Sequence, residues 1–247
     1  YEPVLHDNLT ATPGAYYKSI TNIKRMVEYG VDVSIQTVAL RNNTPHLKRL
    51  IRFLESINVK SFTLQNLIAG PWCRRINFFN LCESPERYEK IIAELERMKQ
   101  KTTIEIDYEA FPFQRPGDYY TGSSKGMKFR AYSTCSAGKT SLQIAPSGDV
   151  YPCPATVSYP KYCLGNILES SLVEIWHNTT RFREFQRFAR TDYSSSACQE
   201  CDAFDLCFGG CHITAERVNG NPLSGDPRCP RVVKRKQVRI PRKDHYG

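Results

Sequence analysis

The sequence predicts an α/β protein made of two unlike parts, the C-terminal half of a partial (β/α) barrel and a small cysteine-rich α+β domain. Three observations lead to this. Helical and strand patterns alternate over residues 16–108, eight of the ten cysteines lie between residues 135 and 229, and a turn-rich segment separates the two regions. The expected parts are residues 1–114 for the barrel strands, 115–131 for a linker, 132–230 for the cysteine-rich domain and 231–247 for a basic tail.

The spacing of apolar residues predicts a first helix–strand–helix unit. Tyr16, Ile20, Ile23 and Val27 recur at helical intervals, and Gly30 follows them as a helix end. Residues 31–40 alternate apolar and polar side chains and are rich in β-branched residues, which predicts a strand. Thr44 and Pro45 then predict the cap and first turn of a helix. The apolar face of that helix consists of Leu47, Leu50, Ile51 and Leu54.

The same pattern then repeats. Residues 62–68 predict a second strand, Ser84 and Pro85 begin a helix, and residues 102–108 predict a third strand. The apolar face of this helix consists of Tyr88, Ile91, Ile92, Leu95 and Met98. Such alternation implies parallel strands with right-handed crossovers. Because three parallel strands cannot close a barrel, we expect the missing half to come from a longer polypeptide or from a partner chain.

Composition places the chain among ordinary globular proteins. Of its 247 residues, 40% are hydrophobic and 24% are charged, and no apolar run reaches the roughly 18 residues of a membrane helix. The start shows no signal-peptide pattern, so we expect a cytoplasmic protein without a membrane partner. Most of the net charge of +9 lies in residues 231–247, which predicts a solvated tail, with a phosphate or leader-peptide contact as the alternative; nucleic acid is not an expected partner.

The cysteines follow a specific spacing. Cys135 is followed after twelve residues by Gly148 and after four more by Cys153, and a second run reads Cys198-x2-Cys201-x5-Cys207-x3-Cys211, with Cys229 seventeen residues further on. Disulfides require an oxidising compartment, for which the chain shows no signal. Structural zinc would need four of the thiolates, whereas eight clustered cysteines can supply two iron–sulfur clusters. Iron–sulfur binding is therefore the preferred interpretation, with zinc as the alternative.

Local turn signals surround these cysteines. Residues 146–149 form a turn between apolar pairs, which predicts a β-hairpin with Cys153 at its return end. Gly209 and Gly210 allow the backbone to pack closely between Cys207 and Cys211. Leu172, Ile175, Trp176, Phe182 and Phe185 recur at roughly helical spacing and are expected to be core residues.

This pattern resembles a known family. Together with Leu164-Gly165-Asn166-Ile167 and Glu174-Ile175-Trp176, the cysteine spacing resembles the SPASM domain that follows the barrel in radical S-adenosylmethionine (radical SAM) enzymes. Residues 6–14 and 33–38 resemble the stretch after the fourth strand of the radical SAM barrel. The resemblance covers about residues 1–230. It implies two auxiliary [4Fe-4S] clusters, and S-adenosylmethionine as cosubstrate of the fuller enzyme.

The resemblance also implies a division of the ligands. By position, Cys198, Cys201, Cys207 and Cys229 would hold the second auxiliary cluster, while Cys135, Cys153 and Cys211 would hold the first. The first cluster then lacks one ligand, which either Cys163 or a substrate donor would supply. Gln36 and Asn66 correspond to positions at strand ends that contact the cosubstrate in relatives, although both are equally compatible with a polar core role.

One departure from the family bears directly on activity. The radical-generating cluster needs a C-x3-C-x2-C motif, which is absent from these 247 residues, so this chain alone is not expected to cleave S-adenosylmethionine. Cys73 and Cys82 have no counterpart in the motif and are expected to be structural thiols rather than a redox pair or a substrate contact.

The expected function is that of the C-terminal part of a radical SAM oxidoreductase or maturase. It would modify a peptide or cofactor precursor, and its auxiliary clusters would transfer electrons or anchor substrate. The expected partners are the precursor, a reductant protein such as a flavodoxin or ferredoxin, and the missing barrel half. The alternatives are a zinc-stabilised module that binds nucleic acid or protein, and a stand-alone iron–sulfur electron-transfer subunit.

Overall fold

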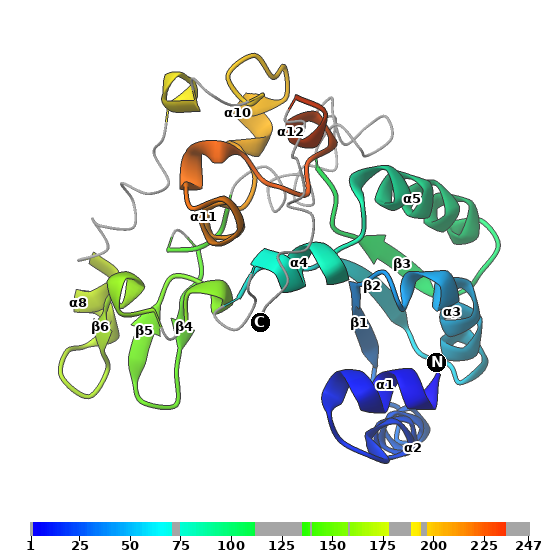
Figure 1. Ribbon diagram of the computed structural model, residues 1–247. Coiled ribbons are helices and arrows are strands. Elements are labelled where there is room, and N and C mark those ends of the chain that lie inside the picture. Colours follow the sequence, from blue (N-terminus) through cyan, green and yellow to red (C-terminus); the bar gives the residue numbers. More distant parts are fainter. Residues whose placement is uncertain are drawn as a thin grey trace, which may run out of the picture. The chain divides into compact units, whose positions relative to one another are not determined.

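The computed structural model describes residues 2–70, 75–111, 135–138, 140–157, 159–177, 189–193 and 197–235 (Figure 1). The chain divides into two compact units, the first comprising Tyr1–Leu67 and Ile76–Ala110, the second Ile68–Arg75 and Phe111–Gly247. The expected linker, 115–131, and the tail from residue 236 onward lie outside the described residues, as do Cys73, Phe182 and Phe185. No helix within the described ranges is long and apolar enough to cross a membrane.

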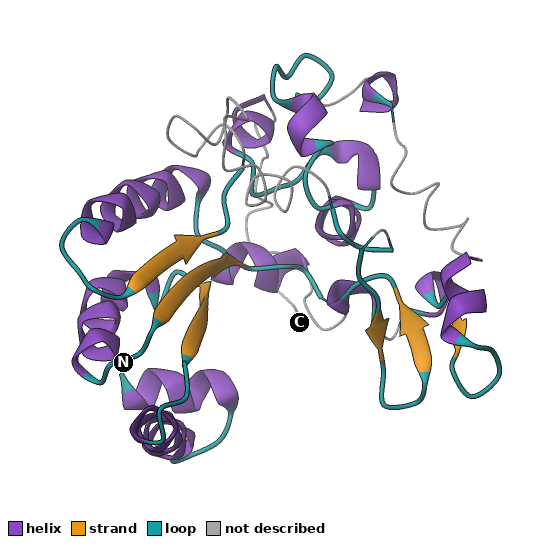
Figure 2. Cartoon of the chain, turned by 180° about the vertical axis from the view of Figure 1, so that it is seen from behind, coloured by secondary structure: helices purple, strands orange, loops and turns teal. Residues whose placement is uncertain are grey.

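The first unit contains the parallel sheet that the sequence predicts. Its strands β1 (Ser34–Ala39), β2 (Ser61–Asn66) and β3 (Glu105–Tyr108) lie in the order β1-β2-β3, and both pairs are parallel (Figure 2). The register places Gln36 opposite Thr63, and Thr63 opposite Asp107. The three strands are therefore shorter than the expected ranges but occur in the expected places.

Helices separate these strands along the chain. They are α1 (Pro3–Thr10), α2 (Ala15–Glu28), the short 3₁₀ helix η1 (Thr44–His46), α3 (Leu47–Ser56), α4 (Arg75–Leu81) and α5 (Pro85–Lys99). The sequence predicts α2, α3 and α5 but neither α1 nor α4. Asp7 explains how α1 joins α2, because its carboxylate accepts hydrogen bonds from the backbone N–H groups of Gly14 (2.6 Å) and Tyr16 (2.8 Å).

The two faces of this sheet differ in character. Side chains that alternate along the strands, such as Phe62 and Leu64 on β2 and Tyr108 on β3, are fully buried in the core with apolar residues of α3 and α5. The intervening positions are polar: Gln36 is exposed, and Thr63 and Asp107 are half-buried. Helices thus cover one face of the sheet, as parallel crossovers require, and the other face carries a polar row.

The two expected helix caps have different outcomes. Ser84 confirms its prediction, since its hydroxyl oxygen accepts the N–H of Arg87 at 3.2 Å and Pro85 begins α5. The prediction for Thr44 is wrong. Its hydroxyl donates to Glu83 Oε2 at 2.9 Å, and the chain makes the 3₁₀ turn η1 before α3 begins. Thr44 therefore lies within η1, and His46 instead occupies the N-cap position of α3.

The second unit has a small sheet and several short helices. Strands β4 (Gln143–Ile144), β5 (Asp149–Tyr151) and β6 (Gly165–Asn166) pair antiparallel in the order β4-β5-β6. The α-helices are α8 (Leu172–His177), α10 (Phe204–Cys207), α11 (His212–Asn219) and α12 (Pro230–Arg235). The 3₁₀ helices are η3 (Pro154–Thr156), η4 (Pro160–Tyr162), η5 (Arg190–Tyr193) and η6 (Pro222–Ser224). The predicted hairpin is confirmed as β4-β5, while β6 is an addition.

Candidate functional site

Nine of the ten cysteines lie in the described residues, and seven of these nine form two sets in the second unit. We call Cys198, Cys201, Cys207 and Cys229 thiol group A, because they line a common pocket. We call Cys135, Cys153 and Cys211 thiol group B, because Cys153 interacts electrostatically with the other two. The structure thus places the four thiols of group A around one pocket, and places Cys135 and Cys211 close enough to Cys153 for their charges to act on its thiol.

Thiol group A lies in apolar surroundings. Phe111, Phe204 and Val232 line the same pocket, and Cys198 and Cys229 are buried. The Cys-x2-Cys segment is a tight turn in which the N–H of Cys201 donates to the carbonyl of Cys198 at 3.2 Å. Such a turn directs both thiols to one side of the chain.

Burial controls the ionisation of these thiols. It raises the pKa of Cys229 to about 12 and also raises the pKa of Cys207, to which the charges of Cys229, Asp226, Cys198 and Cys201 add. Burial and the neighbouring thiolate charges both disfavour ionisation of Cys207 and Cys229, so these two thiols lose their protons readily only when a cation compensates the charge. The donor set therefore suits a positively charged iron core, whose binding would displace the protons.

Two arginines fix the loop that carries Cys201. Arg231 Nη1 donates to Cys201 Sγ at 3.1 Å and also to the carboxylate of Asp202. Arg190 Nη1 donates to the carbonyl of Cys201 at 2.7 Å, and its guanidinium lies 4.9 Å from the centre of the Phe204 ring. The Cys201 loop is thus held through its sulfur, its carbonyl and its neighbouring carboxylate.

A run of left-handed backbone connects the two thiol groups. Phe208, Gly209 and Gly210 have φ values of 49°, 81° and 81°. A Cβ atom on Gly209 would lie 2.6 Å from the ring of the fully buried Tyr193, and one on Gly210 would lie 2.6 Å from Asp226 Cβ. Both positions therefore require glycine, which is how the chain turns sharply between Cys207 and Cys211.

Thiol group B is built around two short helices. Burial raises the pKa of Cys153 to about 11, and the neighbouring Cys211 and Cys135 contribute to this shift. Cys211 is the N-cap of α11, and its Sγ accepts the backbone N–H of Thr214 at 3.4 Å. Thr156 donates through its hydroxyl to the carbonyl of Cys153 at 2.7 Å and closes the turn at η3.

Cys163 and Tyr162 are the next candidates near group B. The Cys163 thiol donates to the carbonyl of Gly165 at 3.5 Å. The hydroxyl of Tyr162 bonds to the carboxylate of Glu216, and burial, Glu216 and the group B thiols raise the Tyr162 pKa. Sequence reasoning missed Tyr162, which precedes a cysteine but carries no motif of its own.

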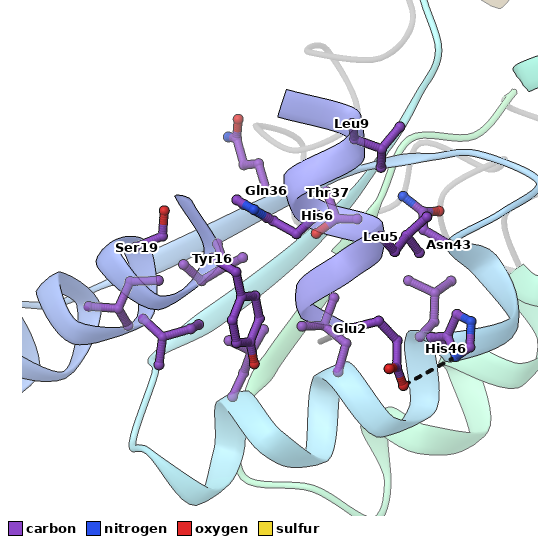
Figure 3. A pocket seen from close by; sticks show the side chains of 16 residues that line it. Glu2, Leu5, His6, Leu9, Tyr16, Ser19, Gln36, Thr37, Asn43 and His46 are labelled. Atoms are coloured by element: carbon purple, nitrogen blue, oxygen red, sulfur yellow. Dashed lines mark ion pairs between the residues drawn. The ribbon is translucent and has the colours of Figure 1, made fainter. Parts of the chain in front are cut away.

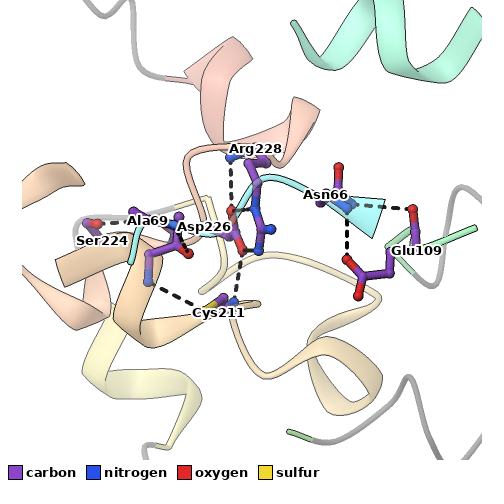
Figure 4. Close-up of polar contacts among 9 residues, drawn as sticks. Asn66, Ala69, Glu109, Cys211, Ser224, Asp226 and Arg228 are labelled. Atoms are coloured by element: carbon purple, nitrogen blue, oxygen red, sulfur yellow. Dashed lines mark hydrogen bonds and ion pairs between the residues drawn. The ribbon is translucent and has the colours of Figure 1, made fainter. Parts of the chain in front are cut away.

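A buried ion pair between Asp226 and Arg228 contacts the backbone of Cys211 (Figure 4). Asp226 has no exposed surface, and its carboxylate accepts hydrogen bonds from Arg228 Nε (2.9 Å) and Nη2 (2.6 Å) and from the backbone N–H of Cys211 (2.9 Å). Its carbonyl accepts the N–H of Cys229 at 3.0 Å. Burial opposes the charge on Asp226, but Arg228 outweighs it and the pKa of the carboxyl falls below its ordinary value. One residue therefore anchors a cysteine of each group.

The donor set fits iron–sulfur clusters. In the described part of the chain, no three His, Cys, Asp or Glu side chains converge as ligands of one metal ion do. A [4Fe-4S] cluster instead binds each thiolate to a separate iron, so four thiols around one pocket suit it. Group A offers four thiols and group B three.

The two expected cosubstrate positions lie in the first unit. Gln36 is exposed on β1, where it borders a cavity of about 220 Å³ lined mainly by apolar residues of α1, α2, β1 and α3 (Figure 3). Asn66 ends β2, and its Nδ2 donates to the carbonyl of Glu109 at 3.3 Å while its N–H donates to the Glu109 carboxylate at 2.9 Å. Asn66 thus ties the ends of neighbouring strands together.

Cys82 occupies a structural position. It is buried, its carbonyl accepts Arg41 Nε at 2.8 Å, and its backbone pairs with Leu40 in an isolated antiparallel bridge. These contacts attach the end of α4 to the chain that follows β1.

The chain is similar in sequence and in fold to several known proteins. SPASM, an iron–sulfur cluster-binding domain, matches residues 135–202. A PqqA peptide cyclase from Ruegeria pomeroyi is 27% identical over 234 residues, covering 93% of this chain and 58% of the relative. The chain resembles radical SAM enzymes with a C-terminal SPASM domain.

Further similarities point the same way. The mycofactocin maturase MftC of Mycobacterium tuberculosis is 35% identical over 119 residues, which is 45% of this chain and 29% of the maturase. SuiB of Streptococcus suis bound to S-adenosylmethionine has the same fold, with a TM-score of 0.61 at 16% identity over 87% of this chain and 48% of SuiB. SuiB bound to its precursor peptide SuiA gives a TM-score of 0.60 at 17% identity, over 87% of this chain and 47% of SuiB. The chain spans a little over half the length of the cyclase.

Proposed function

We propose that this chain forms the later strands of a partial (β/α) barrel and a SPASM domain within a radical SAM enzyme that modifies a peptide. The proposed parts are residues 1–114, the linker 115–131, the SPASM domain 132–230 and the tail 231–247. The observation that carries the proposal is the gathering of seven cysteines into thiol groups A and B, which offers four thiols to one cluster and three to a second.

In this proposal group A holds one [4Fe-4S] cluster through four thiolates, and group B holds a second through three. Bound clusters supply one-electron transfer, or an iron on which a substrate donor is anchored. Cys163 or that donor completes group B, and Tyr162 with Glu216 forms a polar wall beside it. Asp226 keeps the backbone of Cys211 and Cys229 in place.

The polar face of the sheet is the proposed binding surface for S-adenosylmethionine in the first unit. Gln36, Thr63 and Asp107 lie in register across β1, β2 and β3, opposite the face that the helices cover. In a complete barrel this row faces the interior, where Gln36 and Asn66 would contact S-adenosylmethionine. The remaining strands and the radical-generating cluster would come from the fuller enzyme or from a partner chain.

The class of substrate follows from the similar proteins. A PqqA peptide cyclase and a SuiB structure with its precursor peptide are among them, which favours a peptide over a small-molecule precursor. A reductant such as a flavodoxin or ferredoxin would supply electrons, in the cytoplasm. The zinc-module and electron-transfer-subunit interpretations are not favoured.

Metal content tests the clusters. Anaerobically purified protein is expected to hold about eight irons and eight sulfides per chain, because each cluster takes four of each. Cys198→Ala and Cys229→Ala are expected to abolish the same spectroscopic signal, while Cys135→Ala spares it. Colourless protein that retains zinc would contradict the proposal.

Product formation tests the enzyme class. A polypeptide that adds the C-x3-C-x2-C motif and the missing strands is expected to form 5′-deoxyadenosine from S-adenosylmethionine under strong reductant, whereas these 247 residues alone are not. Turnover by the shorter chain would show that the radical chemistry resides in thiol groups A and B.

A further inference from the structure

We propose that Arg231 raises the reduction potential of the cluster at thiol group A by donating a charged hydrogen bond to the Cys201 sulfur. This inference rests on the proposed function, which places a cluster there, and it assigns a tuning role to a residue that is not a ligand. Arg231 belongs to the basic C-terminal segment, where the sequence alone predicts only a solvated charge.

The geometry of the donor is well defined. Arg231 Nη1 lies 3.1 Å from Cys201 Sγ, and the same nitrogen bonds to the carboxylate of Asp202, the residue after Cys201. Arg231 follows Cys229 by two residues, so one short segment supplies both a thiol of group A and the donor to another thiol of that group. The Asp202 carboxylate therefore helps to hold the guanidinium beside the Cys201 sulfur.

The acceptor is fixed equally well. Arg190 donates to the Cys201 carbonyl at 2.7 Å and pairs with Asp205 at 3.0 Å, which holds the loop from its backbone side. Other contacts already restrain the sulfur and the guanidinium, so little conformational entropy is lost when their hydrogen bond forms. The energy of this hydrogen bond can therefore differ between the oxidised and reduced states of a bound cluster.

The expected direction follows from charge. One-electron reduction makes a [4Fe-4S] cluster and its thiolates more negative, and a cation that donates to a ligand sulfur stabilises that state more than the oxidised one. Hydrogen bonds to the sulfurs, net charge and solvent exposure are the terms by which a protein sets such potentials. The Arg231 side chain is 36% exposed, so solvent screens part of the effect.

Three variants test the proposal in anaerobic protein with both clusters loaded. Arg231→Met removes the charge and the donor, Arg231→Gln keeps a neutral donor, and Arg49→Met removes an exposed arginine from the first unit as a control for net charge. The reduced fraction of each cluster is followed by electron paramagnetic resonance during a redox titration. The group A signal is identified by its loss in Cys198→Ala.

In Arg231→Met, we expect the ratio of reduced to oxidised group A cluster at a fixed potential to fall about tenfold, which is about 59 mV for a one-electron couple. In Arg231→Gln, the same ratio is expected to fall about threefold. Arg49→Met and the group B cluster are expected to stay unchanged. If Arg231→Met loses iron, the direction in which Arg231→Gln shifts the group A reduction potential tests the proposal instead.

Two results would count against this role. A group A potential that is equal in wild type and in the variants that retain iron would overturn it, because Arg231 would then only hold the loop in place. A potential that rises would overturn it too. Wild-type protein without any cluster signal would instead contradict the proposed function, so the two failures are distinguishable.

Discussion

Asp226→Asn provides the sharpest test of how the second unit is held together. The substitution keeps the shape of the side chain but removes the charge that faces Arg228, whose side chain is only 11% exposed. Breaking a buried ion pair from one side leaves the partner charge uncompensated and costs about 3–5 kcal/mol. With a urea m-value of about 2 kcal/mol/M, a loss of about 3 kcal/mol lowers the unfolding midpoint by about 1.5 M.

Tryptophan fluorescence is a suitable signal for this unfolding, because Trp176 lies in α8 of the second unit. Asp226→Asn is also expected to lower the iron content of both thiol groups. The double variant Asp226→Asn/Arg228→Met is expected to lose less stability than the sum of the single variants, because it leaves no buried charge.

The pH dependence adds a check of sign. Because the pKa of Asp226 is lowered in the folded protein, its stabilisation is fully present above its ordinary value of 3.8 and is lost as the pH falls through the lowered pKa. The difference in unfolding free energy between wild type and Asp226→Asn is therefore expected to shrink only in acid. A difference in unfolding free energy below 1 kcal/mol at pH 7 would refute the ion-pair argument. Strict additivity of the effects of the two single substitutions would refute it too.

Three further predictions concern single side chains. In cluster-free protein, the pKa of Cys153 is about 11 against the ordinary 9.0, so at pH 8 its thiol is expected to be alkylated about a hundredfold more slowly than an unshifted thiol. Mass spectrometry measures this rate, and a rate equal to that of an unshifted thiol would contradict the burial of Cys153. Gly209→Ala is expected to lower stability and iron content together, since its Cβ would lie 2.6 Å from a buried tyrosine ring; unchanged iron would show that the turn adapts. Ser84→Ala is expected to destabilise the first unit by about 1 kcal/mol in thermal unfolding, and Ser84→Asp, which caps equally well, is its control.

Much of the first unit is readable from local sequence because local rules dominate there. Apolar spacing predicts α2, α3 and α5, and β-branched alternation predicts the three parallel strands. The contrast between Ser84 and Thr44 shows where such rules stop. Both precede a proline at a helix start, but Thr44 donates to Glu83, a contact across 39 residues that no local pattern contains.

The site shows the same limit. Spacing alone indicates a cysteine framework, while its division into two sets came from resemblance to a family. The contacts of Arg231 with Cys201 and of Asp226 with Cys211 join residues 30 and 15 positions apart, so only the fold reveals them. The charged pair Asp226 and Arg228, set beside Cys229, was the one available signal, and charges next to cysteines are common on protein surfaces.

The short run between Cys207 and Cys211 has a consequence for how the protein matures. These neighbours belong to different thiol groups, and the three residues between them turn through left-handed backbone. In the proposed two-cluster protein, binding of the first cluster orders this turn at a cost in conformational entropy, so the second cluster binds to a segment that is already in position. Assembly is then cooperative. A titration with iron and sulfide is expected to populate empty and doubly filled protein at the expense of chains that carry a single cluster.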